Sequence, residues 1–269
     1  MNKVATITST ESEHYDPYLS SFIRGICETT PMWEQNTLIN NTMVIRGLGG
    51  ASQRAIKLCW KTNYSFFAID TGYFGNNKNK IWHRITYNAL QNINTLIKLP
   101  TDRFEIQLKK TFTEIYKPFT PGRKILICPP SDKVMSLFGQ GNAKEWTNRV
   151  VRQLVTLTDR PIEIRLKPIR RDRISTSTIQ QALSDDVHCL ITYNSIAATE
   201  ALMEGKPAIT LGPNAAQLIC ETNLLNIETP KIPSRSQVYM FLMHLSYSQF
   251  SQEEMNNGTA WRILQDMQI

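Results

Sequence analysis

The sequence lacks the marks of a membrane-spanning or secreted protein. No stretch approaches 18 consecutive apolar residues, and the first ten residues contain no apolar core of a signal peptide. The five cysteines are odd in number and include no Cys-x-x-Cys pair, so neither a disulfide framework nor a zinc motif is indicated. We expect a cytoplasmic protein with reduced thiols, no membrane association and no bound metal.

Two common signatures of cofactor and metal sites are also missing. The segment Gly47-Leu48-Gly49-Gly50 follows an expected strand, but it lacks the full G-x-G-x-x-G spacing of a dinucleotide site. No D-x-D motif falls at the end of a strand, because Asp185-Asp186 lies in an expected loop. The sequence also contains no internal repeat or low-complexity run. These absences argue against a nicotinamide cofactor and an obligatory metal.

Composition allows one large domain or two smaller ones. The chain has 269 residues, of which 41% are hydrophobic and 20% charged, which is enough apolar material for a packed core. The formal net charge is +7, a basic bias that suits a polyanionic partner such as a nucleic acid. Charge alone does not separate this interpretation from a basic protein that has no such partner.

Strands and helices alternate along both halves of the chain. Expected strands are followed by amphipathic helices and glycine-containing turns, a pattern typical of α/β proteins with a parallel sheet. The cluster Thr120-Pro121-Gly122 interrupts the pattern, which then starts again. We therefore expect an N-terminal domain at 1–120, a C-terminal domain at 121–250 and a terminal helix within 251–269.

The segment Val187 to Ala216 carries the strongest functional pattern. An apolar run is followed by small polar residues, a helix that starts at or near Ser195, and a second apolar run. Hydroxyls and free N–H groups at a helix start beyond a parallel strand can bind an anion, and a nearby carboxylate can bind ribose hydroxyls. The predicted contacts to a nucleotide in this segment are Tyr193, Asn194, Ser195, Thr199 and Glu200, with Glu200 on the ribose.

Two cations and a hydroxyl follow neighbouring expected strands. Arg165 and Lys167 alternate onto one side at the carboxyl end of their strand, and Ser131 follows the preceding strand at the equivalent point. This combination suits a diphosphate and a departing anion, so Lys167 is also a candidate catalytic residue. Ser131 fits a simple turn serine equally well.

Asp70 is the candidate general base. It ends an expected strand, and in open α/β sheets that end faces the ligand crevice. A carboxylate there can accept the proton of an attacking hydroxyl. An aspartate that caps a turn explains the same position, and His83 is a rival base.

Aromatic, amide and basic residues are interleaved in the segment after Asp70. Cations can bind phosphate while aromatic rings stack on bases, as in the recognition of single strands or flipped bases. A solvated loop beside a core tryptophan explains the same composition. The predicted nucleic-acid contacts are Tyr73, Phe74, Lys78, Lys80, Trp82, His83 and Arg84.

The second half of the chain resembles the nucleotide-binding half of a GT-B glycosyltransferase. The resemblance rests on I-C-P-P-S (Ile127 to Ser131), R-L-K-P (Arg165 to Pro168) and T-Y-N-S-x-x-x-T-E-A-L-x-x-G-K-P (Thr192 to Pro207). It covers roughly Lys124 to Ala216. Capsule and lipid-A-core sugar transferases look similar here, but they commonly carry His-Pro where this chain has Lys167-Pro168.

The first half looks like small bacteriophage glycosyltransferases that modify hydroxymethylated bases in DNA. The resemblance rests on D-T-G-Y-F-G (Asp70 to Gly75) and W-H-R-I-T-Y-N (Trp82 to Asn88). Together the two resemblances imply a GT-B fold, in which two Rossmann-like domains flank a donor/acceptor cleft. The N-terminal domain would then hold the acceptor, and the C-terminal domain would hold the nucleotide sugar.

The activity implied by these resemblances is metal-independent, inverting transfer of a sugar to a hydroxyl. The expected co-substrate is a UDP-sugar with no further cofactor, and the expected acceptor is a hydroxymethylated base of phage DNA in the host cytoplasm. We expect a monomer or a weak homodimer. Two alternatives remain open, namely a sugar transferase for polysaccharide or lipid acceptors and a non-catalytic module that binds nucleic acid.

Overall fold

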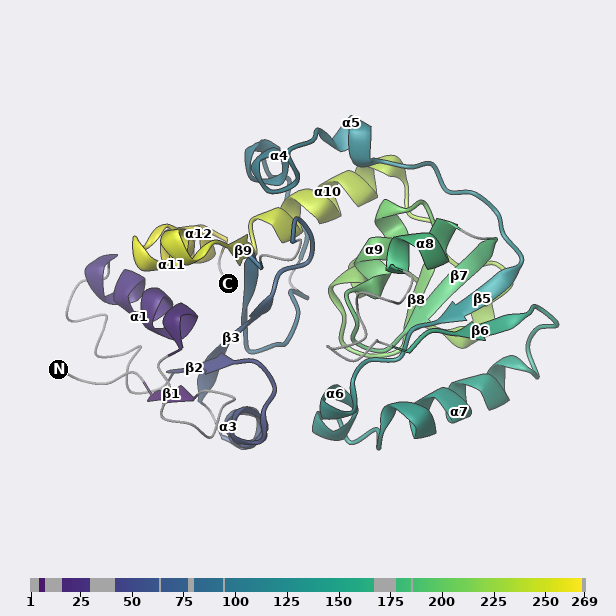
Figure 1. Ribbon diagram of the computed structural model, residues 1–269, viewed down its shortest axis with the longest axis horizontal. Helices are drawn as coiled ribbons and strands as arrows, with labels where there is room; N and C mark the ends of the chain where they lie inside the picture. Colours follow the sequence, from purple (N-terminus) through teal and green to yellow (C-terminus); the bar gives the residue numbers. More distant parts are fainter. Residues whose placement is uncertain are drawn as a thin grey trace. The chain divides into compact units, whose positions relative to one another are not determined.

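The computed structural model describes residues 5–7, 16–29, 42–62, 64–76, 80–93, 95–166, 178–184 and 186–267, with side chains from residue 16 onward. The chain forms two compact units, each with its own sheet (Figure 1). Unit 1 comprises Met1–Asn94, Asp102–Lys109 and Met243–Ile269, and unit 2 comprises Thr95–Thr101 and Lys110–Leu242. The predicted α/β class with two sheet-containing units is confirmed. Thr95–Thr101 belongs to unit 2 and Asp102–Lys109 belongs to unit 1, so the chain passes between the units more than once in this region. The sequence suggested single limits at residues 120 and 250.

Unit 1 is built on a five-stranded sheet of order β1-β2-β3-β4-β9. Its strands are β1 (Ala5–Ile7), β2 (Thr42–Arg46), β3 (Ser65–Thr71), β4 (His83–Tyr87) and β9 (Gln249–Phe250). The first three strands are parallel, whereas β4 runs antiparallel to both β3 and β9. The sheet is therefore mixed, and not parallel throughout as predicted. The pattern of β4 is hidden in the sequence because its buried side chains include His83, Arg84 and Thr86.

Helices cover both faces of this sheet (Figure 1). They are α1 (Pro17–Thr29), α3 (Gly50–Lys61), α4 (Asp102–Leu108), α11 (Gln252–Asn256) and α12 (Thr259–Asp266). On the face that α1, α11 and α12 cover, Phe22, Phe67 and Trp261 pack edge to face, with ring centroids between 5.6 and 6.3 Å apart. Helix α3 lies against the opposite face, so the central strands of this sheet are buried on both sides.

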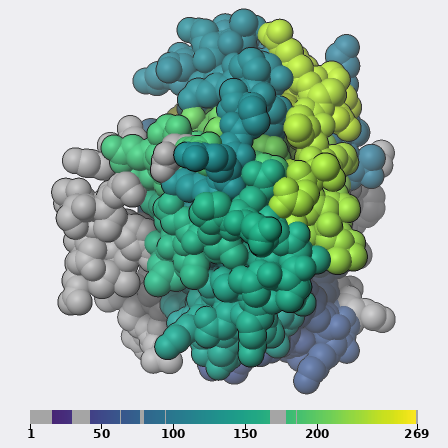
Figure 2. Space-filling view, turned by 90° about the vertical axis from the view of Figure 1, so that its right-hand side faces the viewer, coloured from purple at the N-terminus to yellow at the C-terminus, as the bar shows by residue number. Residues whose placement is uncertain are grey.

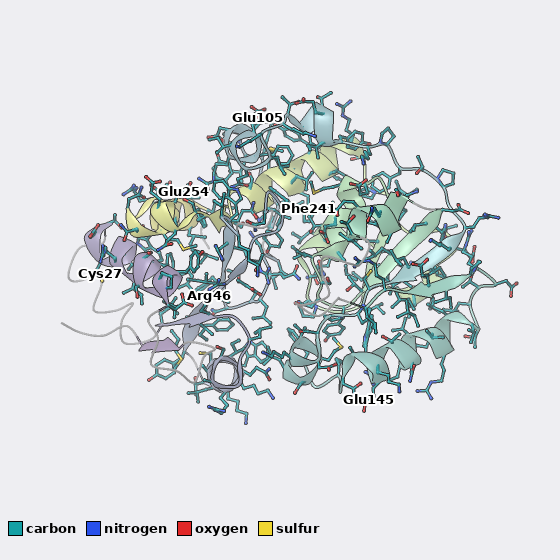
Figure 3. The ribbon with its side chains drawn as sticks, in the orientation of Figure 1. Cys27, Arg46, Glu105, Glu145, Phe241 and Glu254 are labelled. Atoms are coloured by element: carbon teal, nitrogen blue, oxygen red, sulfur yellow. The ribbon has the colours of Figure 1, made fainter. Side chains whose placement is uncertain are left out.

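The C-terminal helices close tightly against α1. A Cβ atom on Gly25 would lie 2.1 Å from the carbonyl oxygen of Met255, so only glycine lets α1 and α11 approach this closely. Gly258, with a φ of 76°, divides the single helix expected from the sequence into α11 and α12. Arg103 of α4 adds an ion pair of 2.5 Å with Glu254 of α11, which is labelled in Figure 3. The segment after residue 243 is thus an integral part of unit 1.

Helix α10 (Arg235–Ser246) carries a buried histidine near its end. His244 is 1% exposed, and neither of its ring nitrogens has a hydrogen-bond partner among the described residues. Burial lowers the pKa of His244 from 6.5 to about 4. For His83 of β4, burial first and then the Arg46 guanidinium lower the pKa to about 4. Both imidazoles are therefore neutral in the folded protein at neutral pH.

We expect the free energy of unfolding to rise with pH between about 4 and 6.5, because in this window the unfolded chain binds protons that the folded chain does not. Each of the two histidines contributes a slope of at most about 1.4 kcal/mol per pH unit. His244→Leu should remove about half of this histidine contribution. Urea unfolding at about pH 5 and about pH 7.5 measures it. An unchanged pH difference in the variant would mean that folded His244 is protonated like the unfolded residue.

Unit 2 holds a four-stranded sheet of order β6-β5-β7-β8 in which all neighbours are parallel. Its strands are β5 (Lys124–Ile127), β6 (Ile162–Ile164), β7 (Val187–Thr192) and β8 (Ala208–Thr210). Each strand overlaps one that the sequence predicts. Because all four strands run in the same direction, their carboxyl ends meet at one edge of the sheet, which is where open α/β sheets bind ligands.

Helices cover both faces of the second sheet as well, with α7 on one side and α8 and α9 on the other (Figure 1). The helices of unit 2 are α5 (Phe112–Ile115), α6 (Asp132–Leu137), α7 (Ala143–Leu154), α8 (Ile179–Ser184) and α9 (Ala197–Met203). Figure 2 views the molecule from the side where the teal-green residues around 150 form much of the surface. Among the helices in the described part of the chain, none combines the length and apolar character needed to cross a bilayer.

Candidate functional site

The carboxyl edge of the unit 2 sheet brings three strand ends together. Cys128 directly follows β5, Arg165 directly follows β6, and Thr192 ends β7. The Thr192 hydroxyl donates a hydrogen bond of 2.6 Å to the carbonyl oxygen of Cys128. The backbone N–H of Arg165 donates to the carbonyl of Ile127 at 2.9 Å. These bonds extend the sheet past the strand ends and fix the positions from which the side chains leave it.

Three charged side chains, those of Arg165, Glu200 and Glu163, act on the Cys128 thiol at this edge. Burial raises the pKa of the Cys128 thiol to about 12, while the nearby Arg165 guanidinium acts to lower it and the Glu200 carboxylate acts to raise it. Arg165 and Glu200 are 35 positions apart in the sequence, and their charges reach one thiol because strand order places β6, β5 and β7 side by side. The charges of Arg165 and Glu200 therefore both act at this edge, and their predicted contacts to the diphosphate and ribose of a nucleotide stay predictions.

The loop before α9 is held by side-chain amides. Asn214 donates to the carbonyl of Ser195 at 2.9 Å, and Asn194 donates to the carbonyl of Pro213. The Ser195 hydroxyl accepts from the N–H of Ala197 at 3.2 Å. Helix α9 begins at Ala197, two residues after the start expected from the sequence, and its N-cap residue is Ile196, which makes no side-chain cap.

Two residues predicted to contact a nucleotide lie in the interior of unit 2. Tyr193 packs against Phe138 and Trp146, with ring centroids 5.6 and 6.3 Å away, and a Cβ on Gly212 would lie 2.4 Å from its ring. Thr199 is fully buried, and its hydroxyl has no partner among the described residues. In this arrangement Tyr193 shapes the edge by packing, and Thr199 faces the core.

Of the other predicted donor residues, Asn194 is buried, Lys167 lies outside the described residues, and Ser131, Arg165, Ser195 and Glu200 are at least partly exposed. Ser131 is exposed at the start of α6, and its side chain caps no N–H of that helix. Glu200 is half-buried and accepts a weak hydrogen bond of 3.5 Å from Gln180 of α8. Lys167 lies outside the described residues, so its proposed part at the diphosphate stays a prediction.

Asp70 forms an ion pair at the corresponding edge of the unit 1 sheet. Its carboxylate lies 2.9 Å from the Arg84 guanidinium and also accepts from the N–H of Thr71 at 2.7 Å. Arg84 donates further to the carbonyls of Thr71, at 2.5 Å, and Leu90, at 3.0 Å. The Arg84 side chain is 9% exposed and that of Asp70 is 39% exposed, so the carboxylate reaches solvent while its partner is buried.

A stack of three side chains lies near Asp70. The ring of Tyr18 lies 3.9 Å from the ring of His83, and the guanidinium of Arg46 lies 4.9 Å from the Tyr18 ring centroid. Arg46, labelled in Figure 3, ends β2 and approaches Asp16 at 3.8 Å. Tyr18 and Arg46 were not predicted from the sequence. The signal for Arg46 was available, because it is a cation at the carboxyl end of a strand, as Arg165 is.

The residues predicted to bind nucleic acid are mostly inside unit 1. Tyr73 and Phe74 are 2% and 7% exposed, whereas a ring that stacks on a base must reach the surface. His83 and Arg84 are buried as well, Trp82 is half-buried and Lys80 is exposed. Lys78 lies outside the described residues. Among the predicted nucleic-acid contacts that the structure describes, Lys80 and Trp82 are the ones that a nucleic acid could reach.

A metal site was not predicted. In the part of the chain that the structure describes, no group of three or more His, Cys, Asp or Glu side chains is arranged to hold an ion. Arg165 is a cation within the described residues that could bind a phosphate at the carboxyl edge of the unit 2 sheet.

Neither a protein-family model nor a curated protein sequence matches this chain. Two solved structures from Thermosulfurimonas dismutans are similar in fold. The β-Kdo 2,4 transferase of KpsC has a TM-score of 0.45 and 14% sequence identity, over 78% of this chain and 80% of that structure. The β-Kdo 2,7 transferase of KpsC has a TM-score of 0.49 and 12% identity, over 96% of this chain and 99% of that structure. At such values no residue role or substrate is carried over to this chain.

Proposed function

We propose that this protein is a glycosyltransferase that moves a sugar from a nucleotide-diphosphate donor to an acceptor hydroxyl. The observation that carries the proposal is the position of Arg165 directly after β6 and of Glu200 in α9 after β7, at the carboxyl edge of a parallel sheet where both charges act on the Cys128 thiol. A cation and a carboxylate at this edge match the two parts of a nucleotide diphosphate that need recognition. The half-buried position of both residues allows direct contact with a ligand.

In the donor half, Arg165 stabilises the diphosphate as it leaves the sugar. Ser131 and Lys167 add a hydroxyl and a second cation, and Ser195 adds a further hydroxyl. Glu200 accepts hydrogen bonds from the ribose hydroxyls. Because these cations offset the charge that develops on the leaving phosphate, we propose that transfer from a UDP-sugar requires no metal.

In the acceptor half, Asp70 takes the proton of the attacking hydroxyl. Arg84 orients its carboxylate, and the exposed part of Asp70 leaves room for an acceptor. Direct attack by a hydroxyl activated in this way inverts the configuration at the sugar carbon. His83 is the weaker base candidate, because its ring is buried and stacked on Tyr18.

Two acceptor classes each have support. A hydroxymethylated base in DNA is supported by the net charge of +7 and by the exposed Lys80. A polysaccharide or lipid-linked sugar is supported by the burial of Tyr73 and Phe74, because these rings are then unable to stack on a base.

Donor and acceptor are tested separately. Thermal shift with UDP-, GDP- and CMP-sugars should show saturable stabilisation by one nucleotide class, by about 2.7 kcal/mol at a hundred times its Kd. Nucleotide release is then measured with hydroxymethylated DNA and with oligosaccharides as acceptors. DNA mobility shifts at two salt concentrations separate binding from transfer. No stabilisation by any nucleotide, together with salt-sensitive DNA binding, would favour a non-catalytic nucleic-acid-binding module.

A further inference from the structure

Gln249, the first residue of β9, is completely buried, and its side-chain amide is fully engaged. The amide oxygen accepts from the N–H of Tyr73 at 2.6 Å and from the N–H of Phe74 at 3.4 Å. The amide nitrogen donates to the carbonyl of Phe74 at 3.1 Å and to the side-chain oxygen of Gln107 at 2.9 Å. Three of these four bonds join Gln249 to a loop that lies 175 positions away in the chain.

That loop is the segment 72–75, which directly follows the strand that carries Asp70. A Cβ on Gly72 would lie 2.6 Å from the side-chain oxygen of Gln249, so glycine is required for the amide to approach. Gly75 has a φ of +78°, and a Cβ there would lie 2.6 Å from the carbonyl oxygen of Gln107. The loop can therefore approach Gln249 and Gln107 this closely because positions 72 and 75 carry no side chain.

A continuous set of contacts leads from Gln249 to the carboxylate of Asp70. The backbone of Tyr73 is bound by Gln249, and its hydroxyl accepts from the N–H of Asn92 at 2.7 Å. The Arg84 guanidinium lies 5.6 Å from the Tyr73 ring centroid and donates to Asp70 at 2.9 Å. Gln249 also pairs with Arg84 in the β4–β9 ladder. A shift of the loop would therefore move the guanidinium that orients Asp70.

We propose that Gln249 is a positioning residue for the acceptor site, and this rests on the proposed function of Asp70. Gln249 holds the loop 72–75 in place, the loop supports Arg84, and Arg84 orients the carboxylate that takes the acceptor proton. The C-terminal part of the chain thus contributes to the acceptor site without contacting the acceptor. Proton transfer from the acceptor hydroxyl depends on Gln249, whereas donor binding does not depend on Gln249.

The test uses Gln249→Met, which keeps the side-chain length but removes the amide. Gln107→Leu is a second variant, because it removes the bonds of the Gln107 side chain to Gln249 and to the Ser246 carbonyl but leaves the bonds of Gln249 to the loop. Gln252→Met is the matched control, since Gln252 is exposed on α11 and contacts Ser21 instead of the loop. Each protein is compared by amide hydrogen exchange, by nucleotide binding, and by kcat and acceptor KM of transfer.

We expect the Tyr73 and Phe74 amides of Gln249→Met to exchange about tenfold faster, because their buried acceptor is lost, while amides of the Phe22 core are unchanged. The kcat of transfer should fall about tenfold or more with nucleotide affinity unchanged, and Gln107→Leu should show the same changes at smaller size. Gln252→Met should match the wild type.

Unchanged exchange at Tyr73 would overturn the proposal, as would equal acceleration throughout unit 1, since Gln249 would then be an ordinary core residue. A normal kcat despite faster loop exchange would also overturn it. A wild-type protein that transfers no sugar to any acceptor contradicts the proposed function instead. The exchange data would then still show whether Gln249 holds the loop.

Discussion

Asp70→Asn is expected to lower the rate of sugar transfer by about 10²- to 10⁴-fold, the usual contribution of a positioned general base. Asparagine has nearly the same shape and can still accept from the N–H of Thr71, but it cannot take a proton from the acceptor. Nucleotide binding should be unchanged, because Asp70 belongs to unit 1 and the proposed donor residues belong to unit 2. Steady-state transfer and thermal shift with the same nucleotide sugar measure the two properties.

Asp102→Asn provides the matched control for this variant. Asp102 is an exposed carboxylate of the same unit that accepts a hydrogen bond of 2.7 Å from Tyr247. Its replacement should leave the transfer rate within about twofold of the wild type, since it contacts no proposed site residue. Near-normal transfer by Asp70→Asn would remove Asp70 as the base and turn attention to His83.

Arg165→Gln is expected to reduce kcat by about 10²- to 10³-fold, with a smaller effect on the KM of the donor. The reason is that negative charge on the diphosphate grows as its bond to the sugar breaks, so a fixed cation stabilises the transition state more than the bound donor. Single-turnover measurement of nucleotide release separates the two effects. Added Mg²⁺ should leave the wild-type rate unchanged if the cations of the protein carry this role alone.

Arg160→Gln is the control for Arg165, because it changes an arginine at the opposite end of the same strand. Arg160 pairs with Glu228 at 3.0 Å and donates to the carbonyls of Gly122 and Arg123, so its loss removes an arginine with structural contacts that is not at the carboxyl edge. A loss of activity in Arg160→Gln as large as that in Arg165→Gln would indicate general damage to β6 instead of a specific charge effect.

Periodicity in the sequence predicts the strands of unit 2 well and those of unit 1 only in part. Buried parallel strands such as β7 are continuous apolar runs, which are easy to recognise. In β4, buried polar side chains are satisfied by distant partners, such as Leu90 and Thr71 for Arg84, and a linear pattern contains no trace of those partners. The antiparallel β4 was therefore missed, and the expected parallel sheet proved to be mixed.

The candidate site divides in the same way. Arg165 and Glu200 were assigned to one edge because strand ends and helix starts follow from periodicity and parallel strand order brings such positions together, while their roles stay predictions. The aromatic residues after Asp70 were assigned to nucleic acid from composition, yet Tyr73 and Phe74 are core residues. Whether an aromatic ring in a loop faces solvent depends on contacts such as those of Gln249, which only the three-dimensional structure contains.

The dependence of unit 1 on α11 and α12 determines the order in which the two units can mature on the ribosome. Unit 2 has its full sequence once Leu242 has been made, whereas the unit 1 core still lacks Trp261 and Leu264 at that point. Domains generally fold as their residues emerge. Here the unit that begins earlier in this sequence completes its core later, because Phe22 and Phe67 share that core with residues of α11 and α12. Chaperones that bind apolar segments therefore have the most time to bind the segments that carry Phe22 and Phe67.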